Sequence, residues 1–522
     1  MNGGINIKKI MFSFLIITIL FLSSFLVAAG TITIEKPNNM TNKVFYNNNI
    51  NQGSFEIIKE SGWPIIYNYS FEDVSRKVII DSEDSIIVTG NTYNNISDEI
   101  DFLTVKYSSD GELIWNALFN GGEIDYAWDI SLDSQDNIIV FGFNSSLNEN
   151  PNELDLTLFV IKYSKDGIEQ WNNTYKWEND CFPGGIAVDS NDNVIMSAGT
   201  GDLDGLSFTC LTLKMDSNGN EIWNVTFEED LLSFGADVVV NSDDDIFIGG
   251  LSASFFGQGW FIIKYDSMGK LKWSQRYNEG NQPNDMEIDS EGNLIMTGQD
   301  YSSDSNSSSW LTLKCDKNGY LLWKYEYDGI NNEYAQDGVV DSKGNIITLG
   351  SVVGDDFYES CLLIFDTNGN EICMKKPSID GSLLGLTVDS DDNIIVTGTI
   401  NNSVNSYNWD YYTCKYSDIE PPYITIEKPK LGYLYLFDKE LFPLLKNTII
   451  LGKIKIRVVE LGASDVEKVL FYIDGNLMES VSNAPFEWLW DDKSFSKHEI
   501  EIHVYDENNN INRKTINVWK FF

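Results

Sequence analysis

Short apolar runs bounded by turn-forming residues recur throughout residues 57–418 and predict β-strands rather than helices. Seven times, an apolar run ends in a motif close to D-S-x-x-N, and a second apolar run then ends in Gly. The copies are DSEDSIIVTG (81–90), DSQDNIIVFG (133–142), DSNDNVIMSAG (189–199), NSDDDIFIGG (241–250), DSEGNLIMTG (289–298), DSKGNIITLG (341–350) and DSDDNIIVTG (389–398). A repeat period of about 50 residues predicts a repeat architecture.

A second pattern follows the first within each repeat and reads as strand, turn, strand. It appears as LTVKYSSDGELIW (103–115), FVIKYSKDGIEQW (159–171), LTLKMDSNGNEIW (211–223), FIIKYDSMGKLKW (261–273), LTLKCDKNGYLLW (311–323) and LLIFDTNGNEIC (362–373). Asp and Asn form turns through local side-chain hydrogen bonds, and Gly accepts the positive φ that such turns need. Each repeat therefore predicts four antiparallel strands, which is typical of a β-propeller blade.

The end of the repeat region predicts how the structure closes. The seventh copy has three strands, up to DYYTCKYS (410–417), and lacks the turn and the fourth strand. Lys59–Trp63 and the run 64–70 resemble that missing piece, so we expect this segment to pair with strand three near 411–416. The predicted fold is all-β: a seven-bladed β-propeller over 57–418, with four antiparallel strands per blade and the last blade closed by an N-terminal strand. The Trp residues of strand four should dock onto the next blade, and the sixth copy has Cys373 at that position; the Trp positions are 115, 171, 223, 273 and 323.

The last hundred residues, 421–522, predict an immunoglobulin-like β-sandwich behind the propeller. Pro421-Pro422 stiffens the junction. A hairpin turn at Asp474-Gly475 joins two alternating runs. Strands are expected in the runs 423–429, 448–461, 466–480, 486–492, 498–510 and 513–519. The run TITIEKP (31–37) nearly repeats YITIEKP (423–429), and it is either a vestigial strand or a linker.

The paired motifs D-S-x-x-N-I-I-V-T-G and K-Y-x-x-x-G-x-x-x-W resemble the seven-bladed propeller repeats of secreted bacterial and archaeal proteins, the SBBP repeats, over about residues 57–418. The tail resembles the immunoglobulin-like domains of secreted prokaryotic proteins. The half-motif D-x-x-G-x-x-x-W is also similar to the propellers of quinoprotein dehydrogenases. That family would imply eight blades, a cofactor and a metal, but the sequence has seven copies and no adjacent Cys pair.

The N-terminus predicts export. Lys8 and Lys9 precede an apolar run to Val27, and Ala29 offers a cleavage point, so 1–29 is a signal peptide or an uncleaved anchor, followed by a linker over 30–56. The expected location is secreted or cell-surface, with membrane contact only through such an anchor. N-x-S/T sequons mark candidate glycosylation sites, although an Asn-rich chain also forms them by chance: Asn39, Asn68, Asn95, Asn144, Asn172, Asn224, Asn306 and Asn401.

Composition excludes several classes of function. The formal charge of −43 repels phosphate backbones, so nucleic acid is not an expected partner. The two histidines, His498 and His503, lie on opposite faces of a predicted tail strand, so the repeat region has no histidine for a nucleophilic triad or a typical zinc site. The six cysteines do not form a disulfide framework, although Cys361 and Cys373 flank one hairpin and could pair.

Four aspartates share one position in the first strand of their repeats and should therefore ring one mouth of the central channel: Asp129, Asp237, Asp285 and Asp337. The other repeats have Lys77, Gly185 and Gly385 there. Like charges this close are costly unless they are solvated or share a cation. The aspartates are thus either caps of their own loops or a collar for a cation such as calcium or for a cationic ligand. No cofactor is expected apart from that calcium alternative.

The loops between strands two and three open beside this collar, differ in length and carry aromatic residues. They include Tyr93, Phe255, Phe256, Tyr301, Phe357 and Tyr358, and the tentative ligand-binding set is Trp260, Trp310 and Trp409 with the four aspartates. We expect a recognition, adhesion or scaffolding protein that binds an extracellular glycan or protein, with no catalytic residues. The alternative is a carboxylate-dependent polysaccharide hydrolase or lyase acting in the funnel.

Overall fold

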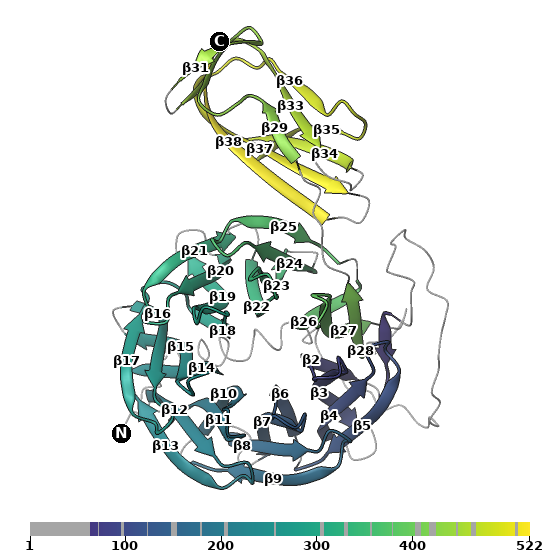
Figure 1. The fold of residues 1–522 in the computed structure, drawn as a ribbon, viewed down its shortest axis with the longest axis vertical. Coiled ribbons are helices and arrows are strands. Elements are labelled where there is room, and N and C mark those ends of the chain that lie inside the picture. The colour runs from purple at the N-terminus through teal and green to yellow at the C-terminus, as the bar shows by residue number, and fades with distance from the viewer. Residues whose placement is uncertain are drawn as a thin grey trace, which may run out of the picture. The chain divides into compact units, whose positions relative to one another are not determined.

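The computed structural model describes residues 63–70, 72–94, 99–122, 124–147, 154–177, 180–202, 207–254, 257–302, 307–327, 332–354, 358–377, 379–401, 409–416, 424–444, 447–460, 466–506 and 510–522. Only β-strands, and no helices, are assigned in these ranges, so the described chain is all-β (Figure 1). The same ranges contain no helix of sufficient length and hydropathy to cross a membrane. The predicted signal segment and linker lie outside them.

Contacts divide the chain into two compact units. Unit 1 comprises Met1–Gly344, Thr348–Ser360 and Ser378–Tyr416. Unit 2 comprises Asn345–Ile347, Cys361–Pro377 and Ser417–Phe522.

Strands β1–β28 pair as seven antiparallel groups of four, in agreement with the four strands predicted for each repeat. The first strands all belong to unit 1 and surround one axis (Figure 1). They are β2 (Asp73–Ile80), β6 (Ile124–Leu132), β10 (Asp180–Val188), β14 (Leu232–Val240), β18 (Gln282–Ile288), β22 (Asn332–Val340) and β26 (Gly381–Val388). The second strands are β3 (Ile86–Asn94), β7 (Ile138–Leu147), β11 (Val194–Asp202), β15 (Ile246–Ser254), β19 (Leu294–Ser302), β23 (Ile346–Val353) and β27 (Ile394–Asn401).

The third strands carry the apolar run that ends in the second turn. They are β4 (Glu99–Tyr107), β8 (Leu154–Tyr163), β12 (Ser207–Met215), β16 (Gly257–Tyr265), β20 (Ser307–Cys315), β24 (Tyr358–Phe365) and β28 (Trp409–Tyr416). The fourth strands are β5 (Leu113–Phe119), β9 (Glu169–Tyr175), β13 (Glu221–Phe227), β17 (Leu271–Arg276), β21 (Leu321–Tyr327) and β25 (Glu371–Lys375), and β1 (Ile65–Tyr67) completes the last group.

The D-S-x-x-N motif forms the turn between the first and second strands. In the first group, the Asp81 carboxylate accepts hydrogen bonds from the backbone N–H of Glu83 and of Ser85, at 3.0 and 2.7 Å. Asp84 has φ of 59°, in the left-handed region that Asp tolerates better than most residues. Side-chain chemistry at the first and fourth positions therefore closes the turn.

A β-bulge in the first strand explains why the apolar run of the second strand ends in Gly. The register of β2 against β3 shifts between Ser75 and Lys77, and the same shift recurs in β6, β10, β14, β18 and β26. A Cβ on Gly90 would lie 2.1 Å from the Val74 carbonyl oxygen. The bulged backbone fills the space that any larger residue at Gly90 would need, so the motif requires Gly there.

Adjacent groups are joined by the Lys and Trp of the second repeat motif. Lys106 pairs with Asp81 of its own group at 2.7 Å and donates to the Lys165 carbonyl of the next group. Trp115 Nε1 also donates to that carbonyl at 3.0 Å, and its ring packs on Gly167. Equivalent Trp-to-carbonyl bonds join Trp171 to Ser217 and Trp223 to Ser267. The predicted docking of these Trp rings onto the next group is confirmed for the described pairs.

The last group is completed by the segment at the start of the described chain. β1 pairs antiparallel with β28, with Ile65 opposite Thr413 and Tyr67 opposite Tyr411. This confirms the pairing predicted from the missing seventh strand. The Trp63 ring lies against Gly111 of the first group, so Trp63 occupies the place of the strand-four Trp.

Unit 2 contains a β-sandwich built from two sheets of strands. One sheet has the order β29-β33-β36, formed by β29 (Ile424–Lys428), β33 (Ile454–Glu460) and β36 (Glu487–Trp490). The other contains β30 (Tyr433–Leu436), β31 (Lys439–Pro443), β32 (Thr448–Leu451), β34 (Val466–Ile473), β35 (Asn476–Val481), β37 (Phe495–Asp506) and β38 (Asn510–Phe521). Phe471, Trp490, Ile500 and Ile502 pack in the core between them.

Two details of the tail prediction are wrong. The run 448–461, expected as one strand, is divided at Gly452 (φ 87°) into β32 and β33, which join different sheets. Strands β30 and β31 were not expected, because their short runs do not alternate. The hairpin at Asp474-Gly475 is confirmed, with both residues at positive φ.

Candidate axial site

The first strands carry one residue per group at an equivalent position, four residues before each D-S-x-x-N turn motif. Lys77, Asp129, Asp237, Asp285 and Asp337 all lie at this position, and we call them the axial cluster. Asp285 and Asp337 are buried, with 5% and 2% exposure. The structure therefore brings Asp285, Asp337 and Lys77 together, as their equivalent positions in the repeats predict.

Lys77 joins two of these aspartates. Its Nζ lies 2.8 Å from Asp285 Oδ1 and 2.6 Å from Asp337 Oδ1. Burial alone would lower the pKa of Lys77, but the carboxylates of Asp285 and Asp337 raise it well above its ordinary value. The lysine is therefore a permanent internal counter-ion for this side of the cluster.

Each axial aspartate also holds the neighbouring group. Each carboxylate accepts a hydrogen bond from the backbone N–H that follows the equivalent position in the next group. The pairs are Asp129 with Ile186 (2.8 Å), Asp237 with Met286 (2.7 Å), Asp285 with Gly338 (3.1 Å) and Asp337 with Leu386 (2.6 Å). A charged acceptor on a backbone N–H is among the stronger hydrogen bonds. The aspartates therefore link adjacent groups, a role that the sequence did not indicate, and Asp129 and Asp237 also accept the N–H of the next residue in their own strands.

The crowding of these carboxylates shifts their titration. Burial, with the nearby charges of Asp285 and Asp129, raises the pKa of Asp237 well above its ordinary value. Burial also raises the pKa of Asp337 well above its ordinary value, against the opposing effect of Lys77. The pKa of Asp129 is likewise raised by burial. Burial and mutual repulsion thus favour the neutral form of these carboxyl groups, while the positive charge of Lys77 opposes it.

Three further residues belong to the site, and the sequence did not reveal them. Glu287 follows Asp285 by two residues, and burial with the Asp285 charge raises its pKa to about 8. Arg76 lies over the Trp128 ring, 3.6 Å from its centroid, and burial lowers the pKa of Arg76 to about 10. Arg76 and Trp128 are the bulge residues of their strands. A bulge has no composition signal of its own, so only the spacing to Lys77 and Asp129 could have indicated them.

Metal binding at the axis remains untested as a prediction. In the part of the chain that the structure describes, no group of three or more His, Cys, Asp or Glu residues could hold a metal ion. Asp216 and Asp366 each close a turn: Asp216 Oδ1 accepts the N–H of Asn218 and of Asn220, each at 2.9 Å. Asp366 makes the same two contacts with Asn368 and Asn370.

The aromatic part of the predicted ligand-binding set needs correction. Trp260 and Trp310 have 0% exposure, because their rings fill the space beside Gly298 and Gly350 of the neighbouring strands. They are core residues and cannot contact a ligand directly. Trp409 is half-buried, and Tyr301 is 45% exposed. Phe255, Phe256 and Phe357 lie outside the described residues.

The structure also shows where the cysteines, the histidines and several of the sequons lie. All six cysteines are free and buried, so Cys361 and Cys373 do not pair. His498 and His503 lie on opposite faces of β37, as predicted, and His498 Nδ1 is 2.6 Å from Asp474 Oδ2. Of the sequons, Asn68, Asn172 and Asn224 are exposed, Asn144 and Asn401 are half-buried, and Asn39, Asn95 and Asn306 lie outside the described residues.

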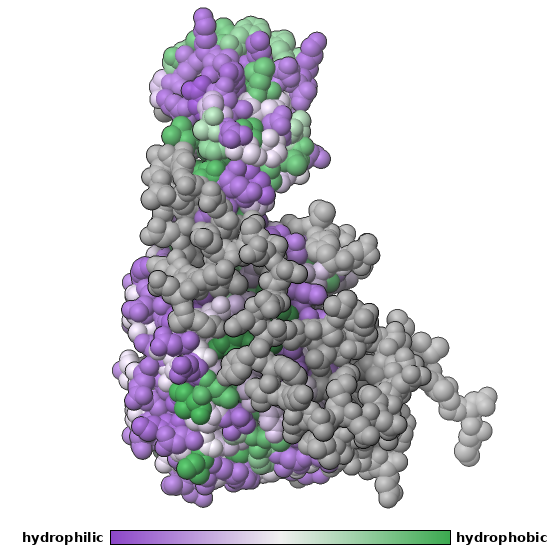
Figure 2. Space-filling model, turned by 90° about the vertical axis from the view of Figure 1, so that its right-hand side faces the viewer, coloured by the Kyte–Doolittle hydropathy of each residue, from purple (hydrophilic) through white to green (hydrophobic). Residues whose placement is uncertain are grey.

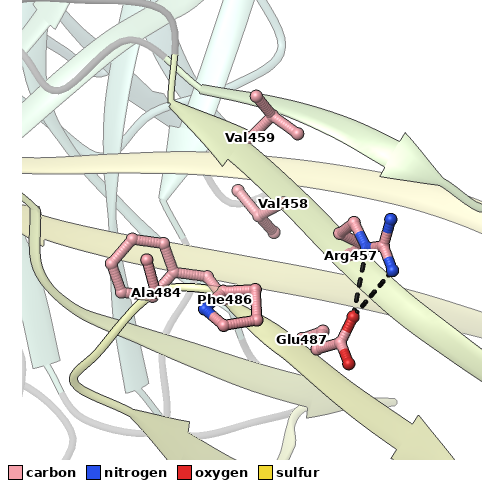
Figure 3. A pocket seen from close by; sticks show the side chains of 7 residues that line it. Arg457, Val458, Val459, Ala484, Phe486 and Glu487 are labelled. Atoms are coloured by element: carbon pink, nitrogen blue, oxygen red, sulfur yellow. Dashed lines mark hydrogen bonds and ion pairs between the residues drawn. The ribbon is translucent and has the colours of Figure 1, made fainter.

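Unit 2 has a shallow pocket of about 540 Å³ (Figure 3). It is lined by Val458, Val459, Ala484 and Phe486 and edged by Arg457 and Glu487. Arg457 Nε and Nη2 donate to Glu487 Oε2 at 3.1 and 2.9 Å. The guanidinium is therefore already paired, and the pocket offers no free charge for a ligand.

Several solved structures resemble the chain at low identity. A polysaccharide lyase of family PL25, an ulvan lyase solved with -[GlcA(1-4)Rha3S]-, has 11% identity and a TM-score of 0.45, covering 68% of this chain and 96% of its own. A protein of unknown function from Bacteroides caccae has 11% identity and a TM-score of 0.37, covering 56% and 93%. Fibronectin(III)-like modules of Clostridium thermocellum CbhA have 21% identity and a TM-score of 0.15, covering 19% and 100%. Similarity at this level does not transfer a function to the chain.

Among curated proteins, no match to the sequence is found. Residues 445–504 match the family described as bacterial Ig domain. That range runs from β32 through most of β37, the strands that build the sandwich core. The chain is therefore an all-β protein whose C-terminal part is a bacterial Ig-like domain.

Proposed function

We propose that the chain is an exported surface protein whose repeat region is a seven-bladed β-propeller that recognises an extracellular glycan or protein and does no chemistry on it. The observation that carries this proposal is the use of the axial aspartates. All four carboxylates accept backbone N–H groups of the neighbouring group, and two of them also bind Lys77. Carboxylates bound in this way stabilise a frame and are poorly available for proton transfer.

Seven blades are supported by the seven sequence repeats, the seven groups of four strands and the contacts from the last group to the first. Neighbouring groups are linked by Trp rings and by axial hydrogen bonds at four joints, and Lys77 pairs with aspartates of two other groups. The loops between the second and third strands differ in sequence and are the natural place for recognition.

The surface chemistry agrees with a soluble binding frame. The net charge is −43, and the coloured surface in Figure 2 is mostly hydrophilic, with separated hydrophobic areas. Exposed aromatic side chains at a loop are suited to stacking on sugars or peptides. Tyr301, at the end of β19 that leads to β20, is the best exposed aromatic residue of this kind among the described residues. Trp409, at the start of β28, is the second candidate.

The experiment is a glycan and protein array probed with the full exported chain. A ligand found there should be lost or weakened about tenfold or more by Tyr301→Ala, which corresponds to one aromatic contact. Tyr320→Ala is the matched control, because Tyr320 is 69% exposed but lies in the turn at the other end of β20. If both changes, or neither, alter the affinity, the loop face is not the binding face.

A second candidate function rests on Glu287. A carboxyl with a pKa of about 8 is protonated at neutral pH and could donate a proton to a leaving group, while Asp285, which pairs with Lys77, lies two residues away. Glu287 and Asp285 are therefore the observation that supports the alternative function, a polysaccharide hydrolase or lyase. The test is the release of reducing or unsaturated ends from acidic polysaccharides. Activity that is present in the native chain and absent in Glu287→Gln would favour the enzyme over the binding protein.

A further inference from the structure

One sequence repeat lies outside the propeller repeats. Residues Ile32–Pro37 and Ile424–Pro429 have the same six residues, ITIEKP. The second copy contains β29 (Ile424–Lys428), which lies in unit 2. The first copy lies outside the described residues. The contacts of β29 therefore show what the same six residues can bind.

β29 is an edge strand that is held by one neighbour. It pairs antiparallel with β33 alone in the sheet β29-β33-β36, with Thr425 opposite Val459 and Ile426 opposite Val458. Ile424 is 6% exposed in the sandwich core, and Ile426 packs against that core. An edge strand with one partner is the part of a sheet that is most easily replaced by an equivalent strand.

The polar contacts of β29 are equally specific. Lys428 Nζ lies 2.6 Å from Asp438 Oδ1 and 5.8 Å from the Tyr435 ring centroid. Glu427 Oε2 lies 3.5 Å from a guanidinium nitrogen of Arg457. Lys36 and Glu35 stand at the equivalent places in the first copy. A strand made of the first copy would therefore restore each of these apolar and charged contacts.

We propose that Ile32–Pro37 of one molecule takes the place of β29 against β33 in a second copy of this chain, which joins the molecules by strand exchange. Because the two segments present the same six side chains, the exchange costs little beyond the loss of free motion, and it should be favoured at the high local concentration of a surface. The predicted cleavage after Ala29 would leave this segment near a free N-terminus, where it can reach another molecule. Extended segments that complete a sheet of another subunit are an established mode of protein recognition.

The register of β29 supplies a sharp test. Thr425 and Val459 are directly opposed and both side chains are exposed, so cysteines at these positions lie within disulfide reach. Full chains carrying Thr33→Cys are mixed with full chains carrying Val459→Cys under mild oxidation. We expect a disulfide-linked pair of chains. The six native cysteines are buried and should not react.

Three variants make the result decisive. Thr425→Cys with Val459→Cys in one chain should crosslink within the chain and confirms the geometry. Replacing Val459→Cys by Glu467→Cys, an exposed position on β34, should give no linked pair above background. Ile34→Lys added to the Thr33→Cys chain should reduce crosslinking about tenfold, because a lysine cannot fill the place of half-buried Ile426.

The proposal is overturned if the Thr33→Cys and Val459→Cys chains do not link under conditions in which the single chain with Thr425→Cys and Val459→Cys forms its internal disulfide. It is also overturned if Ile34→Lys has no effect on linking. A double variant with Thr33→Cys and Val459→Cys in one chain that links only within itself would assign the segment to its own molecule, which contradicts exchange between copies.

Discussion

Ser390 donates hydrogen bonds from its hydroxyl and backbone N to the Asp84 carboxylate, 306 residues earlier in the chain, at 2.7 and 3.1 Å. Both residues belong to D-S-x-x-N turns, in the seventh and the first copy. The same Ser-to-Asp contact joins Ser82 to Asp136, Ser134 to Asp192, Ser190 to Asp244 and Ser342 to Asp392. The last repeat thus contacts the first through the same Ser-to-Asp hydrogen bond that joins other pairs of adjacent repeats.

Closure should depend on Trp63. The Trp63→Ala variant removes a ring that packs on Gly111, so we expect unit 1 to lose about 3 kcal/mol, the lower end for a large aromatic residue because Trp63 is half-buried. Chemical denaturation followed by intrinsic fluorescence measures the loss. Tyr320→Ala, at a 69% exposed side chain, is the control and should change stability by less than about 0.5 kcal/mol. Equal effects of the two variants would show that the N-terminal segment does not hold the last group.

Lys77 should be more important than other paired lysines. The Lys77→Met variant leaves Asp285 and Asp337 buried without their counter-ion, and we expect a loss of about 3–5 kcal/mol at neutral pH. Lys272→Met breaks a pair with Asp266 in which the lysine side chain is 43% exposed, and should cost at most about 1 kcal/mol. Denaturation curves of both variants test the difference. Lowering the pH should reduce the stability loss caused by Lys77→Met but not the loss caused by Lys272→Met. The reason is that protonation neutralises buried carboxylates that have lost their counter-ion.

The stability of unit 1 should fall as the pH rises, in part because of Glu287. Its pKa in the folded state is raised to about 8 from an ordinary value of 4.5. Between these values the folded state keeps a proton that the unfolded state has lost, so unfolding releases a proton and becomes easier with increasing pH. The effect should begin near pH 4.5 and level off above about pH 8. Glu287→Gln should flatten this part of a plot of melting temperature against pH, and an unchanged slope would contradict the assignment.

Calcium should leave the melting temperature of the chain unchanged at millimolar concentration. All four axial aspartates already accept backbone N–H groups, so a cation would have to compete with those bonds and with Lys77. A bound ion would stabilise the folded state by mass action. Thermal melting with and without calcium is the measurement. A rise that disappears when Asp129, Asp237, Asp285 and Asp337 are all changed to Asn would restore the collar for a cation.

Sequence patterns revealed those parts of the molecule that are repeated. The turns, the four strands per repeat and the pairing of β1 with β28 follow from motifs that recur at fixed spacing. The axial position of Asp285 and Asp337 followed from equivalence alone, without knowledge of the bulge. Their role did not follow, because a backbone N–H donor has no signature in the sequence.

Features that occur once were missed or misread. Trp260 and Trp310 resemble exposed loop aromatics by position, yet Gly298 and Gly350 create the space that buries them. Glu287 replaces the apolar or small residue found at this place in most other repeats, so only a comparison of the repeats with each other could have marked it. Single departures from a repeat have no periodicity to reveal them.

The Ser-to-Asp contact between turns also has gaps. The fourth turn position is Gly292 in the fifth copy and Gly344 in the sixth, so Ser242 and Ser290 have no carboxylate to meet there. These two neighbouring joints lie far along the chain from the junction of β1 and β28. The axial carboxylates of Asp237 and Asp285 cross these same two joints, so each joint that lacks the turn contact keeps a charge-assisted hydrogen bond between its first strands.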